Sequence, residues 1–287
     1  MKELFLGSFF ALFLITSHIG VEKPAYLIYS GDGETVSYSE FIQEIKNHDL
    51  IFFGELHNDP IAHWLQYEIA KELIADESRQ THIGMEMFEA DQQILIDEYF
   101  SNVISQSSFE SEARLWSNYK TDYKPIVELA KENAIQLIAT NIPRRYASSV
   151  YRDGLTVLDS LDGKAKQWIA PLPIEVDITI SSYADMAEAA GGHGGDNLIF
   201  SQAVKDATMA HFILLNMGLD DRLLHLNGSY HSNQWEGIIW FIENQVSGYE
   251  IMSINTILVD DPLNVDSEKL NAADYTIVIP QAMTRTY

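Results

Sequence analysis

The sequence predicts an α/β protein, with a mostly parallel sheet flanked by helices and a helical subdomain or cap. Short apolar runs alternate along the chain with segments of helical periodicity, which is typical of strands joined by helical crossovers. The runs end in glycine or polar residues, as strands that stop at one sheet edge do. Apolar residues make up 46% of the 287 residues, enough for a sizeable core.

The first strand and helix illustrate this pattern. The run at 49–53 (DLIFF) reads as a buried strand, and the segment from 61 to 75 reads as a helix. Asp59 suits the N-cap of that helix, and Pro60 suits its first position. The apolar positions recur every four residues, at Ile61, Leu65, Ile69 and Leu73.

The remaining elements repeat the alternation. We expect further strands at 81–85, 135–139, 222–226, 250–258 and 275–279. We expect helices at 126–132, from Pro143 onward, and at 234–245. Residues 18–287 are predicted to form one domain, in which the stretch of about 144–218 is mainly helical and makes the subdomain.

The N-terminal residues favour export. An apolar run covers residues 4–15, shorter than the roughly 20 residues that span a bilayer but suited to the core of a signal peptide. We therefore expect residues 1–17 to be a signal peptide or an uncleaved N-terminal anchor, with a buried first helix as the alternative. Export would place the protein in the periplasm or cell envelope of a bacterium.

Charge and cysteine content exclude several classes of function. The chain has 42 acidic and 18 basic side chains, a net charge of −24, which argues against nucleic-acid binding and against docking on anionic lipid. It contains no cysteine, which excludes disulfides, thiolate metal sites, cysteine nucleophiles and lipid attachment through cysteine.

Polar residues at the predicted strand ends are the candidate site. In an open α/β sheet, ligands bind beyond the carboxyl ends of the strands. Two strands end in the pattern G-x-x-H, at 54–57 and 228–231, and the ends together supply Glu55, His57, Glu86 and His231. These four could hold a divalent metal or form an acid–base cluster. The alternative is that each histidine is a hydrogen-bonded structural residue.

The third strand end is the most basic part of an acidic chain. Asn141 is followed by Arg144 and Arg145 in the first turn of the helix after Pro143, and Arg152 follows soon after. Cations at a helix N-terminus oppose the helix dipole, which an anionic partner would offset. The partner is either a bound anion or a surface carboxylate.

Three further features carry weaker signals. Residues 191–195 (GGHGG) lack the pattern of a phosphate loop and predict a mobile loop or linker that carries His193 near Tyr183. On the following helix, Asp206 is a polar residue on a face expected to pack in the core. His63 is expected at an exposed or hydrophobic-staple position of the first helix and is a minor candidate.

Together these segments resemble the ChaN-like haem-binding uptake family. The order of the motifs matches over about residues 48–245. The residues that carry the resemblance are GELHNDP (54–60), MEMFEADQQ (85–93), Trp116, Tyr123-x-Pro125, NIPRRYASSVYRDGL (141–155), QAVKDATMAHF (202–212) and GSYH (228–231).

The resemblance implies an exported protein that binds haem in a groove and serves haem or iron uptake. Some members hold cofacial haems across a homodimer, with a tyrosine on the iron and a partner histidine near the propionates. Tyr183 or Tyr146 would then be the iron ligand, with His193 nearby and Arg144 on a propionate. Lipidated members carry a cysteine that this chain lacks, so membrane association is expected only through the N-terminal segment.

The wider superfamily implies an alternative function. Erythromycin esterases and Tiki-type metalloproteases share the paired G-x-x-H and glutamate residues. By that resemblance the chain would be a metal-dependent hydrolase of an ester or amide. Glu55, His57, Glu86 and His231 would hold Mn, Co or Zn or activate water, and Arg144 would stabilise the oxyanion.

Overall fold

An eight-stranded, mostly parallel sheet forms the centre of the protein. The computed structural model describes residues 22–189, 191, 194–218 and 220–287. The strand order is β2-β1-β8-β7-β3-β6-β4-β5; the six strands from β8 to β5 run parallel, and β1 pairs antiparallel with β2 and β8. The strands are β1 (Leu27–Ser30), β2 (Thr35–Val36), β3 (Leu50–Glu55), β4 (Thr81–Glu89), β5 (Leu137–Asn141), β6 (Arg222–Gly228), β7 (Ile251–Val259) and β8 (Tyr275–Pro280).

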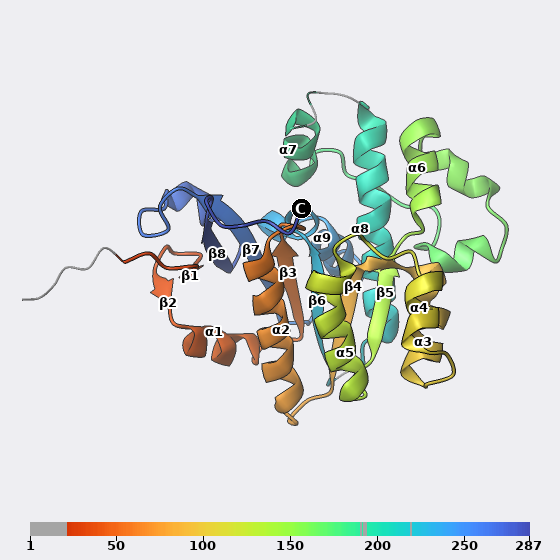
Figure 1. Cartoon of the computed structure of the whole chain (residues 1–287). Coiled ribbons are helices and arrows are strands. Elements are labelled where there is room, and N and C mark those ends of the chain that lie inside the picture. The colour runs from red at the N-terminus through yellow and green to blue at the C-terminus, as the bar shows by residue number, and fades with distance from the viewer. Residues whose placement is uncertain (1–21, 190, 192–193, 219) are drawn as a thin grey trace, which may run out of the picture.

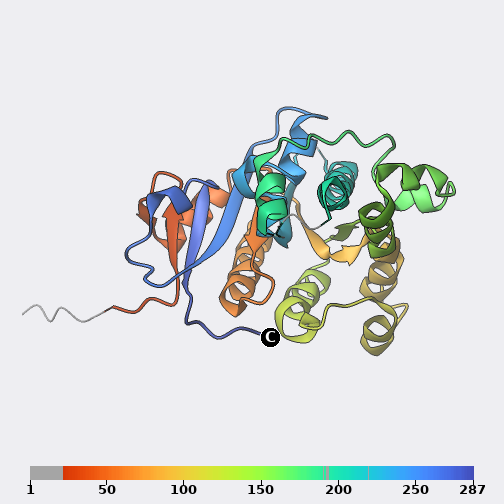
Figure 2. The same cartoon turned by 90° about the horizontal axis from the view of Figure 1, so that it is seen from above.

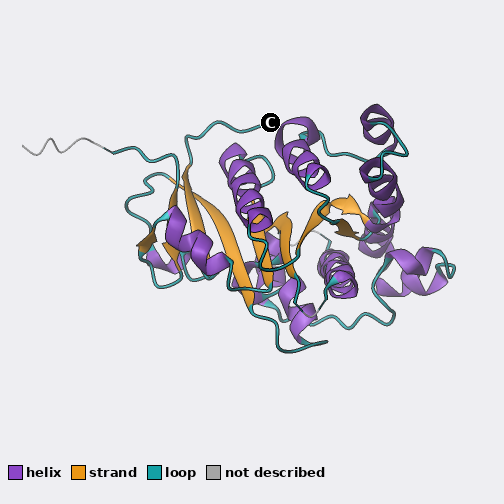
Figure 3. Ribbon diagram, turned by 90° about the horizontal axis from the view of Figure 1, so that it is seen from below, coloured by secondary structure: helices purple, strands orange, loops and turns teal. Residues whose placement is uncertain are grey.

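Helices cover both faces of this sheet, which confirms the predicted fold class (Figures 2 and 3). The larger core cluster packs one face under α1 (Tyr38–Ile45), α2 (Pro60–Ala75), α3 (Gln93–Phe100), α4 (Gln106–Glu112) and α5 (Lys124–Glu132). The second cluster packs the other face under α8 (Asp196–Asn216) and α9 (Ile238–Glu243). Helix α8 is long and apolar enough to span a membrane, but half of its most apolar stretch is buried inside the protein.

The central strands are buried on both faces because helices cover them. Every residue of β3 and β6 is buried, and the two strands pair in register, with Gly54 opposite Asn227 and Glu55 opposite Gly228. The two G-x-x-H segments therefore leave the sheet side by side. Continuous apolar runs of this kind are typical of parallel strands.

Helix α2 begins where the sequence predicts. The Asp59 side chain accepts hydrogen bonds from the backbone N–H groups of Ile61 and Ala62 at 2.9 and 3.0 Å, and Pro60 occupies the first turn. This N-cap fixes the loop between β3 and α2, which carries His57.

The predicted helical subdomain contains α6 (Arg144–Asp153), α7 (Ser181–Ala189) and the first half of α8, which rise above the carboxyl ends of the strands (Figure 1). A small cluster holds α6 against α8 through residues such as Val150 and Val204. The second half of α8 packs against β5, so the subdomain and the sheet share one helix.

Two predicted boundaries were wrong. Strand β4 continues to Glu89, past an irregularity between Met85 and Glu89, so Glu86 lies within the strand. The helix expected at 234–245 begins only at Ile238, because Gln234 and Trp235 adopt φ angles of +61° and +55°. Gly237, at φ +58°, passes so close to the backbone of His231 that a Cβ atom would clash with it.

Candidate functional site

A buried carboxylate, Glu55, organises the first half of the site. It ends β3 and is 1% exposed. One oxygen, Oε1, accepts hydrogen bonds from the Tyr123 hydroxyl at 2.6 Å and from His57 Nδ1 at 2.9 Å. The other, Oε2, accepts from Gln66 Nε2 at 2.6 Å and lies 3.4 Å from His63 Nδ1. We call these residues the Glu55 network.

The charges in the Glu55 network are mutually stabilising. Burial opposes ionisation of Glu55, but hydrogen bonds from His57 and His63 lower its pKa to about 2. Burial likewise disfavours a charged His63, yet Glu55 and Asp122 raise the pKa of His63 to about 9. The pKa of His57 is raised too, since its hydrogen bond to Glu55 and the charge of Glu86 outweigh its burial.

His63 belongs to the Glu55 network, whereas the sequence analysis gave it an exposed or hydrophobic-staple position on α2 and only minor weight. It is buried, and its Nε2 atom lies 3.4 Å from Asp122 on the π-helical turn Tyr119–Tyr123. Asn118 bonds both Asp122 and the backbone carbonyl of His57, at 2.6 and 2.8 Å. Helix α2 buries a face wider than its four-residue apolar stripe, which is why the periodicity missed His63.

The second half of the site joins the sheet to the helical subdomain. His231 lies between two carboxylates, with Nε2 3.2 Å from Glu86 and Nδ1 hydrogen-bonded to Asp206 of α8. Tyr183 of α7 donates to the other oxygen of Asp206 at 2.8 Å. The backbone N–H of Gly228 donates to Glu86 at 2.7 Å. These residues form the His231 network, and all of them are buried.

Burial and charge act in opposite directions in the His231 network. Burial disfavours the imidazolium, but Glu86 and Asp206 raise the pKa of His231 to about 10. Burial also disfavours an ionised Glu86, while His231 and His57 hold its pKa well below the usual range. For Asp206 burial dominates, and its pKa is raised. His231 therefore carries a positive charge at neutral pH.

Gly228 brings the two networks together. A Cβ atom at this position would lie 2.8 Å from the His57 ring and 3.6 Å from Glu86 Oε2, so only glycine lets the imidazole approach the strand. The predicted site residues thus converge on one sheet edge, Glu55 paired with His57 and Glu86 paired with His231.

The divalent metal that the sequence suggested finds no support here. Among the described residues, no group of three or more histidines and carboxylates is placed to hold an ion. Both oxygens of Glu55 already accept hydrogen bonds, and both ring nitrogens of His231 lie against carboxylates. Glu55 and His231 as arranged here do not fit a metal, because their oxygens and ring nitrogens already face protein partners.

An arginine-lined cavity of about 750 Å³ opens beside His57. Its lining includes Arg114, Trp116, Arg144, Arg145 and Tyr287. The Trp116 ring meets the His57 ring edge-on with 4.8 Å between centroids, and the His57 side chain is 38% exposed. We call this space the arginine cavity.

The arginines of this cavity differ in their partners. Arg114 pairs with Glu89 and Asp91, and Arg145 also pairs with Asp91. Arg144 is exposed and makes no hydrogen bond or ion pair with any residue that the structure describes. Its charge is therefore available to an anion. Arg114 escaped the sequence analysis because it lies in a loop distant from the arginines after Pro143.

The two tyrosines proposed as iron ligands have different environments. Tyr146 is half-buried on α6, with its hydroxyl 3.2 Å from Arg145 Nη2 and its ring under that guanidinium. Tyr183 is fully buried and bonded to Asp206, and burial together with that charge raises its pKa. His193 lies outside the described residues. Within the described part of the chain, Arg152 pairs with its neighbour Asp153 alone, and it is not one of the residues that line the cavity.

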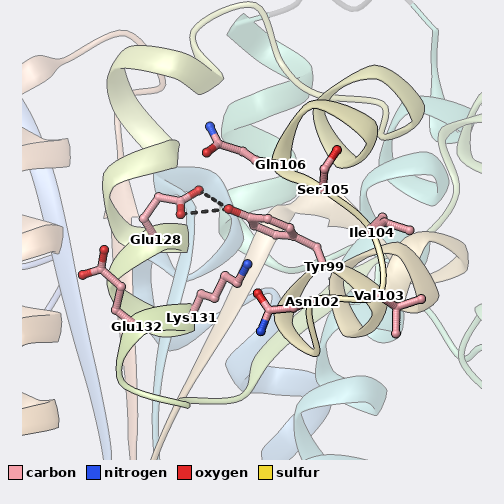
Figure 4. Close-up of a pocket in the computed structure, with 9 residues that line it drawn as sticks. All are labelled: Tyr99, Asn102, Val103, Ile104, Ser105, Gln106, Glu128, Lys131 and Glu132. Atoms are coloured by element: carbon pink, nitrogen blue, oxygen red, sulfur yellow. Dashed lines mark hydrogen bonds between the residues drawn. The ribbon is translucent and has the colours of Figure 1, made fainter.

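A second hollow lies away from this site, between α3, α4 and α5 (Figure 4). Tyr99 donates hydrogen bonds to both oxygens of Glu128, and Lys131 lies 3.7 Å from the centre of the Tyr99 ring. Because these polar groups already interact with one another, we interpret the hollow as a solvated depression of the surface.

The sequence and the fold are both similar to those of known haem-binding proteins. Residues 41–242 match the family described as "Haem-binding uptake, Tiki superfamily, ChaN". The chain belongs to this family. None of the curated proteins matches the sequence.

One solved structure shares the fold of this ChaN family member, and a second is a weaker match. The structure described as "Cofacial heme binding to ChaN of Campylobacter jejuni" superposes with a TM-score of 0.67 at 20% identity, covering 88% of this chain and 96% of that one. The erythromycin esterase EreC, as its H289N mutant in the open conformation, matches at 14% identity with a TM-score of 0.45, over 80% of this chain and 76% of that one. At such identities the likeness concerns the fold.

Proposed function

We propose that this protein binds haem in the arginine cavity. The observation that carries the proposal is Arg144, which has no ion-pair partner among the described residues and lines a cavity that also presents an aromatic wall, in a chain of the haem-binding uptake family. A porphyrin combines a flat apolar surface with two carboxylates, and the cavity offers Trp116 to the first and arginines to the second. The ChaN of Campylobacter jejuni, which shares the fold, is described with cofacial haem.

The residues of the cavity take distinct roles in this proposal. Arg144 binds a propionate. Its guanidinium is exposed, so the propionate does not have to displace a partner among the described residues. Tyr146 is the better candidate for the iron ligand because it is only half-buried and its hydroxyl is hydrogen-bonded to Arg145, which lines the cavity. Tyr183 would have to give up its bond to Asp206 first. When bound, haem supplies a ferric iron that a phenolate oxygen can ligate.

Titration of the purified protein with hemin tests this directly. We expect saturable binding with a tyrosinate-type absorption spectrum that is lost in Tyr146→Phe and kept in Tyr183→Phe. Arg144→Ala should weaken binding about tenfold or more, since a charge-assisted hydrogen bond contributes about 1.5–3 kcal/mol. Arg152→Ala is the matched control, because Arg152 is an equally basic residue of α6 outside the cavity. Absence of saturable binding overturns the proposal.

We further propose that the protein is exported and takes part in haem or iron uptake. The apolar run at residues 4–15 supports export to the periplasm or envelope, with residues 1–17 as a cleaved signal or as an anchor that associates with the membrane. Cell fractionation with N-terminal sequencing distinguishes these forms, and a cytosolic, unprocessed product refutes export. A homodimer formed on haem binding is part of this proposal. Light scattering with and without hemin measures it.

Hydrolysis of an ester or amide is the second candidate function. One observation favours it: His57 is oriented by a buried carboxylate, is 38% exposed, and packs edge-on against Trp116 of the arginine cavity. Arg144 would stabilise a developing oxyanion there. Chromogenic esters and amides should then be hydrolysed, and His57→Ala should abolish the activity. Analysis for Mn, Co and Zn in protein purified without chelators decides whether an ion accompanies it.

A further inference from the structure

The C-terminal segment crosses the protein to reach the site. After β8, at one side of the sheet, residues 281–287 run past the carboxyl end of β3 towards the start of α2 and α5 (Figures 1 and 2). The segment leaves the sheet through a hydrogen bond from Gln281 N to Val259 O at 2.7 Å, and Met283 packs against the main core.

Four contacts anchor the segment beside the Glu55 network. Arg285 forms an ion pair with Asp59, the fully buried N-cap of α2. The Thr286 backbone N–H donates to Asn58 O at 3.0 Å, and the Thr286 hydroxyl donates to Asp122 at 3.3 Å. The Asn58 side chain donates to Tyr287 O at 3.2 Å. An ion pair between the half-buried Arg285 and the buried Asp59, supported by backbone hydrogen bonds, holds Tyr287 in place.

Tyr287 then forms part of the wall of the arginine cavity. It lines the cavity together with Trp116 and Arg144, and its side chain remains 66% exposed. Burial and the charges of Glu55 and Asp122 raise the pKa of Tyr287, so the hydroxyl stays neutral. An exposed aromatic ring held in the wall of a cavity by an ion pair is placed to cover a flat ligand.

We infer that Tyr287 is a ligand-contact residue of the arginine cavity and that Arg285 is the residue that positions it. The ligand class is a planar aromatic anion, and the inference rests on the proposed haem binding. The ring of Tyr287 covers the ligand on the side of the C-terminal segment, while Arg144 neutralises its carboxylate. The Asp59 ion pair couples this wall to the loop that carries His57.

Binding of hemin and of metal-free protoporphyrin IX to the full chain tests this inference. Equilibrium affinity is followed by quenching of tryptophan fluorescence, and hemin dissociation by transfer to excess apomyoglobin. We expect Tyr287→Ala to weaken both ligands about threefold to tenfold through faster dissociation, because an aromatic contact is lost. Tyr287→Phe retains the ring and should bind like the wild type.

The anchor is tested in parallel. Arg285→Ala should reproduce the faster dissociation of Tyr287→Ala, Arg285→Lys should restore it in part, and Arg152→Ala should have no effect. Tyr287→Ala leaves the Asp59 ion pair intact and therefore decides the matter even when Arg285→Ala fails to fold. Unchanged affinity and dissociation in Tyr287→Ala overturn the inference while haem binding stands. A wild type that binds neither ligand overturns the proposed function itself.

Discussion

The two histidine–carboxylate networks use the same chemistry for different purposes. The Glu55 network lies on the sheet and its neighbouring helices, and one of its histidines, His57, is 38% exposed and packs against Trp116 of the arginine cavity. The His231 network is closed to solvent and ties β4 and the loop after β6 to α7 and α8. A ligand can therefore contact the first network, whereas the second holds the helical subdomain on the sheet.

The two networks also differ in the number of side chains that hydrogen-bond or pair with the central carboxylate. Four side chains surround the oxygens of Glu55, so loss of one leaves the charge bonded. Asp206 has His231 and Tyr183 as its side-chain partners, and burial raises its pKa. The Glu55 network should therefore tolerate substitutions that the His231 network does not.

The largest effect is expected from Asp206→Ala. It leaves a charged His231 with one carboxylate partner in a buried position, which costs about 3–5 kcal/mol of unfolding free energy. Denaturant unfolding measures the loss. The control is Asp185→Ala, an exposed aspartate of α7, which should stay within about 0.5 kcal/mol of the wild type. Equal stability of the two variants would show that the His231 network does not hold the subdomain.

The pH dependence of stability should separate the networks next. The folded pKa of His231 is raised from 6.5 to about 10, so its stabilisation is complete below pH 6.5 and is lost as pH rises towards 10. His63 acts in the same direction between 6.5 and about 9. Between its unfolded and folded pKa values, each of these histidines lowers the free energy of unfolding by about 1.4 kcal/mol for every unit by which the pH rises.

Unfolding curves collected from pH 6.5 to 9.5 test this slope. His231→Gln should flatten it, and His63→Gln should flatten it to a smaller extent. Glu55 should produce the opposite pH dependence on the acid side. Its pKa is lowered to about 2, so its contribution to stability is lost as pH falls from 4.5 towards 2. An unchanged alkaline slope in His231→Gln contradicts a charged His231.

The sequence alone located both members of each pair, Glu55 with His57 and Glu86 with His231, but not the networks around them. Strand ends are visible as apolar runs that stop, so Glu55, His57 and His231 could be placed at one sheet edge before the structure was known. Asp122 and Asn118 could not, because they lie on a π-helical turn with no periodic signal. Their role depends on a contact with His63 from a distant segment.

The cavity shows the same limit. Arg144 and Arg145 follow a predicted strand, and their charge stands out in an acidic chain. Arg114 and Tyr287 reach the cavity from a loop and from the C-terminal segment, which carry no hydrophobic pattern. Asp206 was visible as a polar residue on an apolar helical face, and the structure supplies its reason in the buried His231.

The buried tyrosines that donate to Glu55 and to Asp206 offer a matched and smaller test. Tyr123→Phe and Tyr183→Phe each remove a hydroxyl that donates to a carboxylate, at 2.6 and 2.8 Å. Each should cost about 1.5–3 kcal/mol, the usual contribution of a hydrogen bond to a charged group. We expect Tyr183→Phe at the upper end, because Glu55 keeps three other donors. Thermal and denaturant unfolding compare them, and a larger loss in Tyr123→Phe reverses the assignment of the two networks.

The smallest effect on stability is expected from His57→Ala. Glu55 keeps its bonds to Tyr123 and Gln66, and the His57 side chain is already partly exposed, so the loss should be about 1 kcal/mol or less. The same change removes the ring packed against Trp116 and should shift tryptophan emission and the response to hemin. Asp206→Ala should show the opposite behaviour: a large loss of stability and, under conditions in which the protein is still folded, little change in the emission of Trp116. If both variants changed stability and tryptophan emission together, the two networks would act as one unit. Gly228 is the residue placed to couple them, because it packs between His57 and Glu86.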